Sequence, residues 1–270
     1  EKKPEFIREI LSIRDNILNN KELSERIRHK YSIKNVTGLN ILPFIYYDDP
    51  FDIIAHLLVG SEGTLAFLSE VTMKTEHDFP YKASAMLYFR DIREACRAVV
   101  MFSKMRDNNG NSIVKGAELL DKKSLSSVND IAGEGLTAIL TEVKGNSPEE
   151  LAEHIAEITK SLEHYELAVP VYFTDKEEEY SKYWAIRSGI FPSVGGTRPL
   201  GTTCLIEDVA FHIQDLPEAV ADLQDLMEKH GYHDACIYGH SLEGNFHFIL
   251  NQPFDTEQEI QRYESLMNDV

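Results

Sequence analysis

Two histidines seven positions apart, His240 and His247, form the pattern with the clearest potential for chemistry. On one straight strand they would face opposite sides, because side chains alternate along a strand. Strand-like residues on both sides of 243–244 instead predict a hairpin with a two-residue turn, 238–241 against 246–250. In that register His240 lies directly opposite His247, and side chains so placed can bind one metal ion. A packed or turn-capping histidine pair is the alternative interpretation.

Arg187 is the second residue that could act on a ligand. It follows Tyr180, Tyr183 and Trp184 at helical spacings, so it lies on or beside an aromatic helix face that the core should bury. A buried guanidinium requires an anion, because an unpaired charge is costly away from water. A structural salt bridge, or a side chain that extends along the surface to water, would satisfy the same pattern.

A glycine-rich segment, Gly60-Ser61-Glu62-Gly63-Thr64, stands where a helix-like run over 52–58 gives way to strand-like alternation over 65–74. Glycine permits a positive φ and a close backbone approach to a ligand. Amide groups in such a bend form a ready anion site. From the residues alone, an ordinary glycine turn is the simpler interpretation of the segment.

Together with Asn35-Val36-Thr37-Gly38-Leu39-Asn40, the glycine-rich segment resembles the FAD-contacting part of the FAD-linked oxidases of the vanillyl-alcohol oxidase superfamily. The run from Gly239 to His247 resembles the metal-binding His-x6-His of the D-lactate and D-2-hydroxyglutarate dehydrogenases. Trp184-Ala185-Ile186-Arg187 resembles the family's Trp-x-x-Arg, whose arginine holds the substrate carboxylate. The chain is most similar to large bacterial members that carry a C-terminal iron–sulfur module.

The resemblance implies a cofactor, a metal and a set of site residues. FAD contacts fall on Gly60, Ser61, Glu62, Gly63 and Thr64, and a divalent metal, expected to be zinc, falls on His240 and His247. Arg187, His240 and His247 are the expected catalytic residues, and Arg187, Arg198 and Asn245 the expected substrate residues. Bidentate carboxylate binding suits a guanidinium.

The sequence also departs from the family pattern. A threonine four residues after the arginine is replaced by Phe191, and a lysine two residues before Asp208 is replaced by Ile206. The distal group of the substrate is therefore expected to be held differently, with Arg198 as the candidate. The pair Glu207-Asp208 is expected to close a strand, where it either helps to position the metal or a histidine or forms a strand-end turn.

The family's third metal ligand, a glutamate in a downstream Glu-His-Gly segment, has no match after His247, and its pyrophosphate-binding loop has none in residues 1–59. We therefore expect a fragment with two parts. Residues 1–76 correspond to a partial FAD-binding domain, and residues 77–270 to the substrate-binding cap domain, truncated at its C-terminal end. An iron–sulfur cluster, if the protein has one, and a catalytic base belong outside these residues.

Composition narrows the class of protein. A net charge of −18 over 270 residues opposes nucleic-acid binding, so an anionic substrate requires a local positive site. No apolar run reaches the roughly 18 residues of a membrane span. Three separated cysteines without metal spacing predict a reducing cytoplasm. The expected location is cytoplasmic or peripheral at the inner face of the membrane.

Alternation of strands and helices after Pro80 predicts an α+β or α/β domain whose helices cover one face of a sheet, and the resemblance selects α+β. Strands are expected over 83–89, 137–143, 167–173 and 202–211, with helices beginning after Asp91, Ser147, about Asp175 and Asp215. The acidic run 177–179 predicts a solvated first helical turn. An antiparallel sheet with ferredoxin-like units is what the resemblance implies.

The expected activity is oxidation of a D-2-hydroxy acid, of the D-lactate or D-2-hydroxyglutarate class, to its 2-keto acid. The expected electron acceptor is a quinone, a cytochrome or an electron-transfer protein, and a homo-oligomer is compatible with the sequence. Two alternatives stand beside this reading: a metal-independent flavin oxidase of an alcohol or sugar, and a non-catalytic ligand-binding module.

Overall fold

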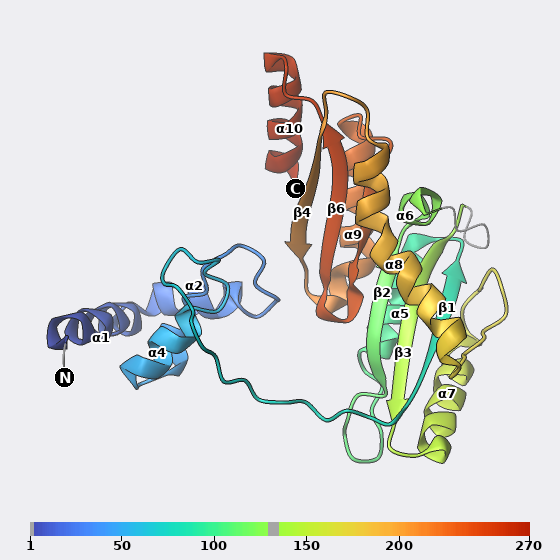
Figure 1. The fold of residues 1–270 in the computed structure, drawn as a ribbon, viewed down its shortest axis with the longest axis horizontal. Coiled ribbons are helices and arrows are strands. Elements are labelled where there is room, and N and C mark those ends of the chain that lie inside the picture. The colour runs from blue at the N-terminus through green and yellow to red at the C-terminus, as the bar shows by residue number, and fades with distance from the viewer. Residues whose placement is uncertain (1–2, 129–134) are drawn as a thin grey trace. The chain divides into compact units, whose positions relative to one another are not determined.

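The computed structural model describes residues 3–128 and 135–270. The chain forms two compact units, Glu1–Glu76 and His77–Val270 (Figure 1). Among its described residues, the first unit contains α1 (Pro4–Asn19), α2 (Lys21–Lys30), α3 (Pro43–Tyr46) and α4 (Pro50–Leu57). Proline stands in the first turn of α1, α3 and α4, where its missing N–H has no intrahelical partner to lose. Ile17, Ile27, Phe44, Ile45 and Ile53 form a small core.

The strand expected over 65–74 is not formed, so that prediction is wrong. Residues 65–79 have no regular secondary structure, and apolar side chains such as Phe67 and Met73 are 93% and 78% exposed. A strand requires a neighbour to satisfy its backbone groups. The described part of the first unit holds no strand that could pair with this segment.

The second unit is built on one six-stranded sheet. Its strands are β1 (Tyr81–Phe89), β2 (Val114–Leu120), β3 (Thr137–Gly145), β4 (Thr203–Ala210), β5 (Cys236–His240) and β6 (Asn245–Gln252). Their order is β1-β3-β2-β5-β6-β4, and all neighbours are antiparallel. The helices are α5 (Ile92–Phe102), α6 (Lys122–Ser127), α7 (Pro148–Leu162), α8 (Glu177–Thr197), α9 (Leu216–Lys229) and α10 (Glu257–Asp269). The α+β class with an antiparallel sheet is thus confirmed.

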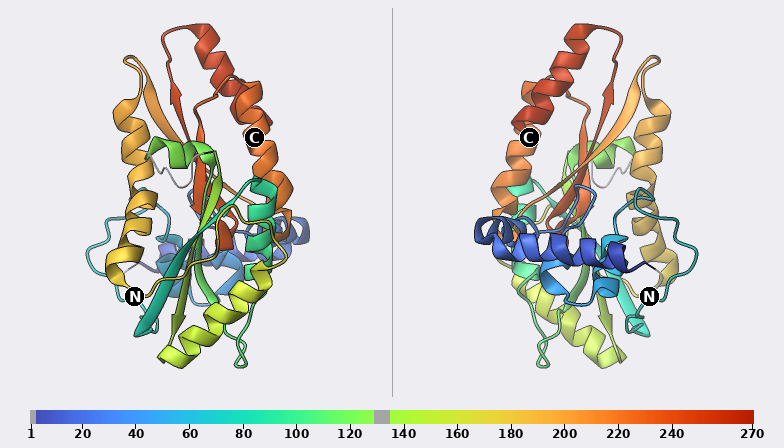
Figure 2. Two further views of the ribbon diagram at one scale, coloured as in Figure 1. Left: turned by 90° about the vertical axis from the view of Figure 1, so that its right-hand side faces the viewer. Right: turned by 90° about the vertical axis from the view of Figure 1, so that its left-hand side faces the viewer.

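Helices cover both faces of this sheet, so the prediction of a single covered face is wrong. Figure 2 shows α8 on one side of the strands, with α5, α7 and α9 on the other. Neighbouring strand residues divide accordingly: Leu119 packs in the cluster with α5 and α9, and Leu120 in the cluster with α6 and α8. The strands bury apolar residues on both faces, and each face therefore requires its own cover.

The segment expected as a strand over 167–173 is not one either. It contacts the edge of β1 only through isolated bridges, Phe89 with Leu167 and Ser84 with Thr174. Pro170 lies between these points, and a proline has no N–H for a continuous ladder.

The predicted helix starts after Asp91 and Ser147 are confirmed. The side chains of Asp91 and Ser147 accept the backbone N–H of Glu94 and Glu150, respectively.

The acidic run 177–179 forms the first turn of α8, as predicted, with Glu177 and Glu178 exposed, but Glu179 is also anchored. Glu179 accepts hydrogen bonds from the Thr174 hydroxyl at 2.7 Å, Lys176 at 3.0 Å and the Tyr172 hydroxyl at 2.9 Å. These bonds favour the ionised carboxylate and lower the pKa of Glu179 to about 2. The helix that carries Arg187 is thereby fastened to the preceding segment.

A depressed folded-state pKa makes this anchor sensitive to acid. Its stabilisation is complete above the unfolded pKa of about 4.3 and is lost as the pH falls toward about 2. We expect the loss of unfolding free energy between pH 6 and pH 3 to be smaller in Glu179→Gln than in the wild type, as measured by urea unfolding. Equal losses in both proteins would show that Glu179 does not contribute this dependence.

Candidate active site

Four adjacent strands present polar side chains on the sheet face that α8 covers. Cys236 and Tyr238 of β5 and Ile249 of β6 belong to the α8-side cluster. Because side chains alternate along a strand, His240 and His247 point to that same face. The same alternation places Glu118 beside Leu120 of β2, and Asp208 in phase with Cys204 of β4. Arg187 reaches this group from α8.

The histidines share a face, but the predicted register is wrong. Tyr238, not His240, lies opposite His247, so the two histidines are diagonal neighbours. Their ring centroids are 5.6 Å apart and their planes meet at 82°. The connection is longer than a two-residue turn, because residues Ser241–Glu243 form a 3-10 turn that ends at Gly244 with φ +65°. Glu243 is exposed there, as expected for a residue at the tip.

Gly244 sits where no other residue fits well. A Cβ at this position would lie 2.2 Å from the carbonyl oxygen of Phe211, in addition to the left-handed backbone. We expect Gly244→Ala to lower the free energy of unfolding by about 3 kcal/mol, measured by denaturant titration. Gly231→Ala is the control, because Gly231 has φ +78° with nothing within 4 Å, and about 1 kcal/mol is expected there. Equal costs would mean that the contact with Phe211 does not matter.

Each histidine is held by a carboxylate through Nδ1. Glu118 Oε1 lies 2.6 Å from His240 Nδ1, and Asp208 Oδ1 lies 3.1 Å from His247 Nδ1. Asn245 Nδ2 donates to the same Asp208 oxygen at 2.6 Å. Asp208 therefore lies inside β4 and orients a histidine, rather than closing the strand in a turn. Its neighbour Glu207 points to the opposite face, where it accepts a hydrogen bond from Tyr263.

The anion that Arg187 requires is Glu118. Arg187 Nε lies 3.1 Å from Glu118 Oε2, and the guanidinium carbon lies 5.2 Å from the centre of the Tyr238 ring. Burial raises the pKa of Tyr238, so the ring is a neutral phenol at physiological pH. The ion pair is the structural salt bridge that the sequence allowed as an alternative. The Arg187 Nη atoms have no hydrogen bond to any described residue.

Of the other two predicted substrate residues, Asn245 contacts this cluster, whereas Arg198 has its hydrogen bonds elsewhere. Arg198 follows the end of α8 and donates to the carbonyl oxygens of Gly195, in the last turn of that helix, and of Thr202. Asn245 contacts Asp208 and the Val209 carbonyl, so the structure gives it a supporting contact behind His247.

The glycine-rich segment belongs to the first unit. Gly60, Glu62 and Gly63 all have positive φ, of +80°, +50° and +76°. Two pairs of hydrogen bonds close the bend: Ser61 donates to the carbonyl oxygen of Leu58, and Thr64 donates to the carbonyl oxygen of Ser61. The amides of Gly60, Glu62 and Gly63 donate no hydrogen bond to the described parts of the chain. The bend thus has the open amide groups of an anion-binding turn.

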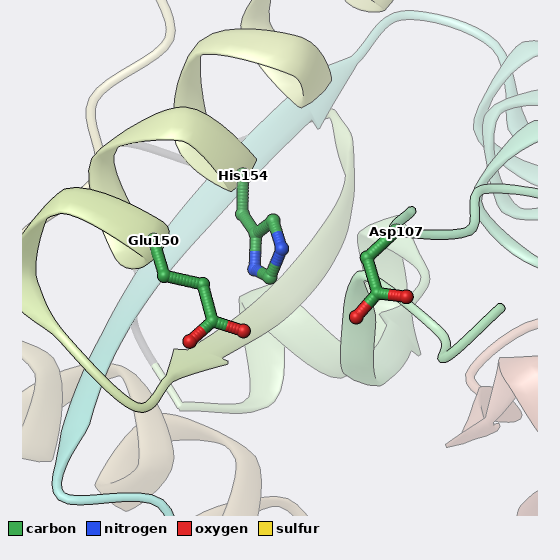
Figure 3. Close-up of side chains that lie close together, drawn as sticks. All are labelled: Asp107, Glu150 and His154. Atoms are coloured by element: carbon green, nitrogen blue, oxygen red, sulfur yellow. The ribbon is translucent and has the colours of Figure 1, made fainter. Parts of the chain in front are cut away.

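Among the residues that the structure describes, no His, Cys, Asp or Glu completes a three-ligand group with the histidine pair. In the two described stretches, the one set of three with all ligand atoms within 4.8 Å of one another is Asp107, Glu150 and His154 (Figure 3). Both carboxylates of this set already accept hydrogen bonds from nearby backbone N–H groups. Asp107 accepts the backbone N–H of Asn109 and Asn111, and Glu150 accepts that of Asn146, so turn and helix-cap bonding explains the cluster.

Glu118 is the central residue that the sequence reasoning missed. No strand was predicted over 114–120, and the glutamate carried no motif of its own. The available signal was its position between Ala117 and Leu119-Leu120, since a charged residue within a buried run requires a partner.

Comparison with known proteins places the fold in a family. Residues 80–270 match the family of FAD linked oxidases, C-terminal domain. The chain is 24% identical to glycolate oxidase subunit GlcD of Bacillus subtilis and 26% identical to mitochondrial D-2-hydroxyglutarate dehydrogenase of Arabidopsis thaliana. Each match spans 80% of this chain, but 45% and 38% of the respective relatives. The chain belongs to the FAD-linked oxidases.

A solved structure of alkyldihydroxyacetonephosphate synthase shares the fold. It superimposes with a TM-score of 0.53 at 14% identity, covering 80% of this chain and 43% of that one. The chain thus spans less than half the length of the relatives it matches. Among the described helices, none is long and apolar enough to cross a membrane.

Proposed function

We propose that this chain carries the substrate-binding part of an FAD-dependent dehydrogenase that oxidises a D-2-hydroxy acid to its 2-keto acid. One observation carries the proposal: two carboxylate-anchored histidines and an arginine with unengaged Nη atoms share one sheet face. Membership of the FAD-linked oxidases supplies the redox class. The names of two relatives, D-lactate dehydrogenase and D-2-hydroxyglutarate dehydrogenase, support the D configuration and the acid.

The residues fit a divalent metal, proposed to be zinc, at His240 and His247. Metal-binding histidines commonly donate their other ring N–H to a carboxylate. His240 has this hydrogen bond with Glu118, and His247 Nδ1 lies 3.1 Å from Asp208 Oδ1. A bound metal would polarise the 2-hydroxyl group and lower its pKa. His240 and His247 would supply its ligands, and Asp208 and Asn245 keep His247 in place.

Arg187 is proposed to bind the substrate carboxylate. Its Nε is engaged by Glu118, so the two Nη groups remain for a bidentate contact, which fixes the orientation of the C2 hydrogen. FAD, when bound, supplies the hydride acceptor. Gly60, Ser61, Glu62, Gly63 and Thr64 are proposed as flavin contacts, supported by the open amides of their bend. Arg198 is proposed for the distal group of the substrate.

The division of the chain is interpreted in the same way. Residues 1–76 are proposed as part of an FAD-binding domain and residues 77–270 as the cap domain, with an iron–sulfur module proposed from the resemblance alone. Two relatives, a glycolate oxidase subunit and a D-lactate dehydrogenase [cytochrome], support by their names a multisubunit setting and a cytochrome-type acceptor. A quinone or an electron-transfer protein is the alternative acceptor, and a cytoplasmic or membrane-peripheral location is proposed with it.

The proposed function is tested by anaerobic flavin absorbance of the flavin-loaded protein that contains this chain. D-lactate, L-lactate, D-2-hydroxyglutarate and D-malate are added separately, with and without a chelator. Bleaching by one D-acid that is abolished by chelation and restored by zinc is the expected result. Bleaching unaffected by chelation would favour a metal-independent oxidase, and no bleaching by any of these acids would overturn the proposal.

A further inference from the structure

Glu118 occupies the junction between the two halves of the sheet. It lies on β2 directly opposite His240 on β5, at the pairing that joins β1-β3-β2 to β5-β6-β4. The residue is 8% exposed, and its two carboxylate oxygens are used separately. Oε1 faces His240 Nδ1 at 2.6 Å, and Oε2 faces Arg187 Nε at 3.1 Å.

The contact with His240 determines which imidazole nitrogen is left for a ligand. A carboxylate only accepts hydrogen bonds, so Nδ1 carries the proton in this contact. In the neutral imidazole, Nε2 then presents its lone pair away from Glu118. Asp208 makes the corresponding contact with His247 from β4. A metal would therefore be bound through Nε2 of His240, in the arrangement of a carboxylate–histidine–metal triad.

The contact with Arg187 determines which guanidinium groups remain for the substrate. Glu118 engages Nε, and the Tyr238 ring lies against the guanidinium plane. Both terminal Nη groups remain available, and together they form the two-pronged donor that matches a carboxylate. A buried carboxylate is strongly disfavoured unless cations or hydrogen bonds compensate it. The contacts with His240 and Arg187 therefore also offset the cost of burying the Glu118 carboxylate.

We propose that Glu118 is a positioning residue that serves both halves of the site: Oε1 sets His240 for a metal, and Oε2 sets Arg187 for the substrate carboxylate. The inference rests on the proposed function, because it assigns the metal to His240 and the substrate to Arg187. It adds a physical link between them, since one side chain holds both groups in register.

The informative variant is Glu118→Gln, which keeps the shape of the side chain but has only one acceptor oxygen. The amide can accept from His240 or from Arg187 but not from both, so one contact must be lost. We expect zinc affinity of the purified chain to fall about 10–100-fold, the usual effect of removing an outer partner of a metal ligand. Should the amide oxygen stay with His240, affinity for oxalate, a carboxylate probe, falls by a comparable factor instead.

A second readout does not depend on the metal. In the metal-free chain at pH 8, ¹⁵N spectra should show His240 in the Nδ1–H tautomer, and Glu118→Gln should shift the population toward Nε2–H or weaken the oxalate affinity. Glu142→Gln is the matched control, because Glu142 lies on neighbouring β3 and pairs with Lys144 at 3.0 Å, outside the site. Its zinc and oxalate affinities should equal those of the wild type.

The outcomes separate this inference from the proposed function. If the wild-type chain binds zinc and oxalate, and Glu118→Gln binds both within threefold of wild type, the positioning role of Glu118 is overturned. The proposed function is not affected by that result. A wild-type chain that binds neither zinc nor oxalate would overturn the proposed function and with it the positioning role. A wild-type His240 in the Nε2–H tautomer would contradict the Glu118 contact itself. A drop in melting temperature matched by Glu142→Gln, without loss of affinity, would identify a purely structural carboxylate.

Discussion

Replacing His240 or His247 with alanine is expected to lower the zinc affinity of the chain by about 100-fold or more. A structural zinc site gains about 10–16 kcal/mol from its few ligands, so one imidazole contributes several kcal/mol. The two rings are close, with centroids 5.6 Å apart, and each has its Nδ1 fixed by a carboxylate. Competition with a chromophoric chelator at pH 7.5 measures the affinity of each variant.

His233→Ala provides the control for these two variants. His233 also contacts a carboxylate through Nδ1, that of Glu228 at 2.5 Å, but its side chain is 68% exposed and it lies outside the cluster. Zinc affinity should be unchanged in this variant. A drop in His233→Ala equal to that in His240→Ala would show that zinc binds to surface histidines and not to the pair.

Arg187→Met is expected to affect stability and substrate binding together. It leaves the carboxylate of Glu118 with one partner, and removal of one member of a buried ion pair costs about 3–5 kcal/mol. Because 23% of the Arg187 side chain is exposed and His240 still contacts Glu118, we expect about 2–3 kcal/mol in urea unfolding. Loss of the charged fork should also weaken hydroxy-acid binding about 10–100-fold, as measured by the KM of the flavin-loaded protein.

Arg93→Met separates the effect of burial from the loss of a charge. Arg93 pairs with Glu218 through the same Nε geometry at 3.0 Å, but the two side chains are 37% and 67% exposed. An exposed pair of this kind contributes little to stability, because water and salt screen it. If Arg93→Met and Arg187→Met destabilise the chain equally, the burial of Glu118 is not important for the site.

Local signals predicted most of the elements that position the site. Capping residues such as Asp91 and Ser147 have their expected bonds, because a cap depends on residues within one helical turn. The His240–His247 hairpin was also predictable as a hairpin, since both strands have local apolar patterning. Its register was not, because the 3-10 turn at 241–243 depends on a close approach of Gly244 to Phe211, which is distant in the sequence.

The partners of the site could not be predicted for a related reason. Glu118 meets His240 across 122 positions and Arg187 across 69, through a pairing of β2 with β5 that no local pattern specifies. Asp208 was suspected of orienting a histidine, but its choice of His247 follows from the β4–β6 register. The unformed strand over 65–74 illustrates the same limit. Alternation indicates that a segment could form a strand, but not whether a neighbouring strand is present to pair with it.

The most direct test of the account is the visible absorption spectrum of the chain loaded with cobalt(II) in place of zinc, recorded before and after addition of D-lactate or D-2-hydroxyglutarate. If the metal lies at His240 and His247 and the acid is held by Arg187 beside it, one acid should change the cobalt bands in the wild type. The change should be lost in Arg187→Met, while the bands themselves should be lost in His240→Ala. Cobalt bands that persist in His240→Ala, or that no hydroxy acid alters, would contradict a shared metal and substrate site.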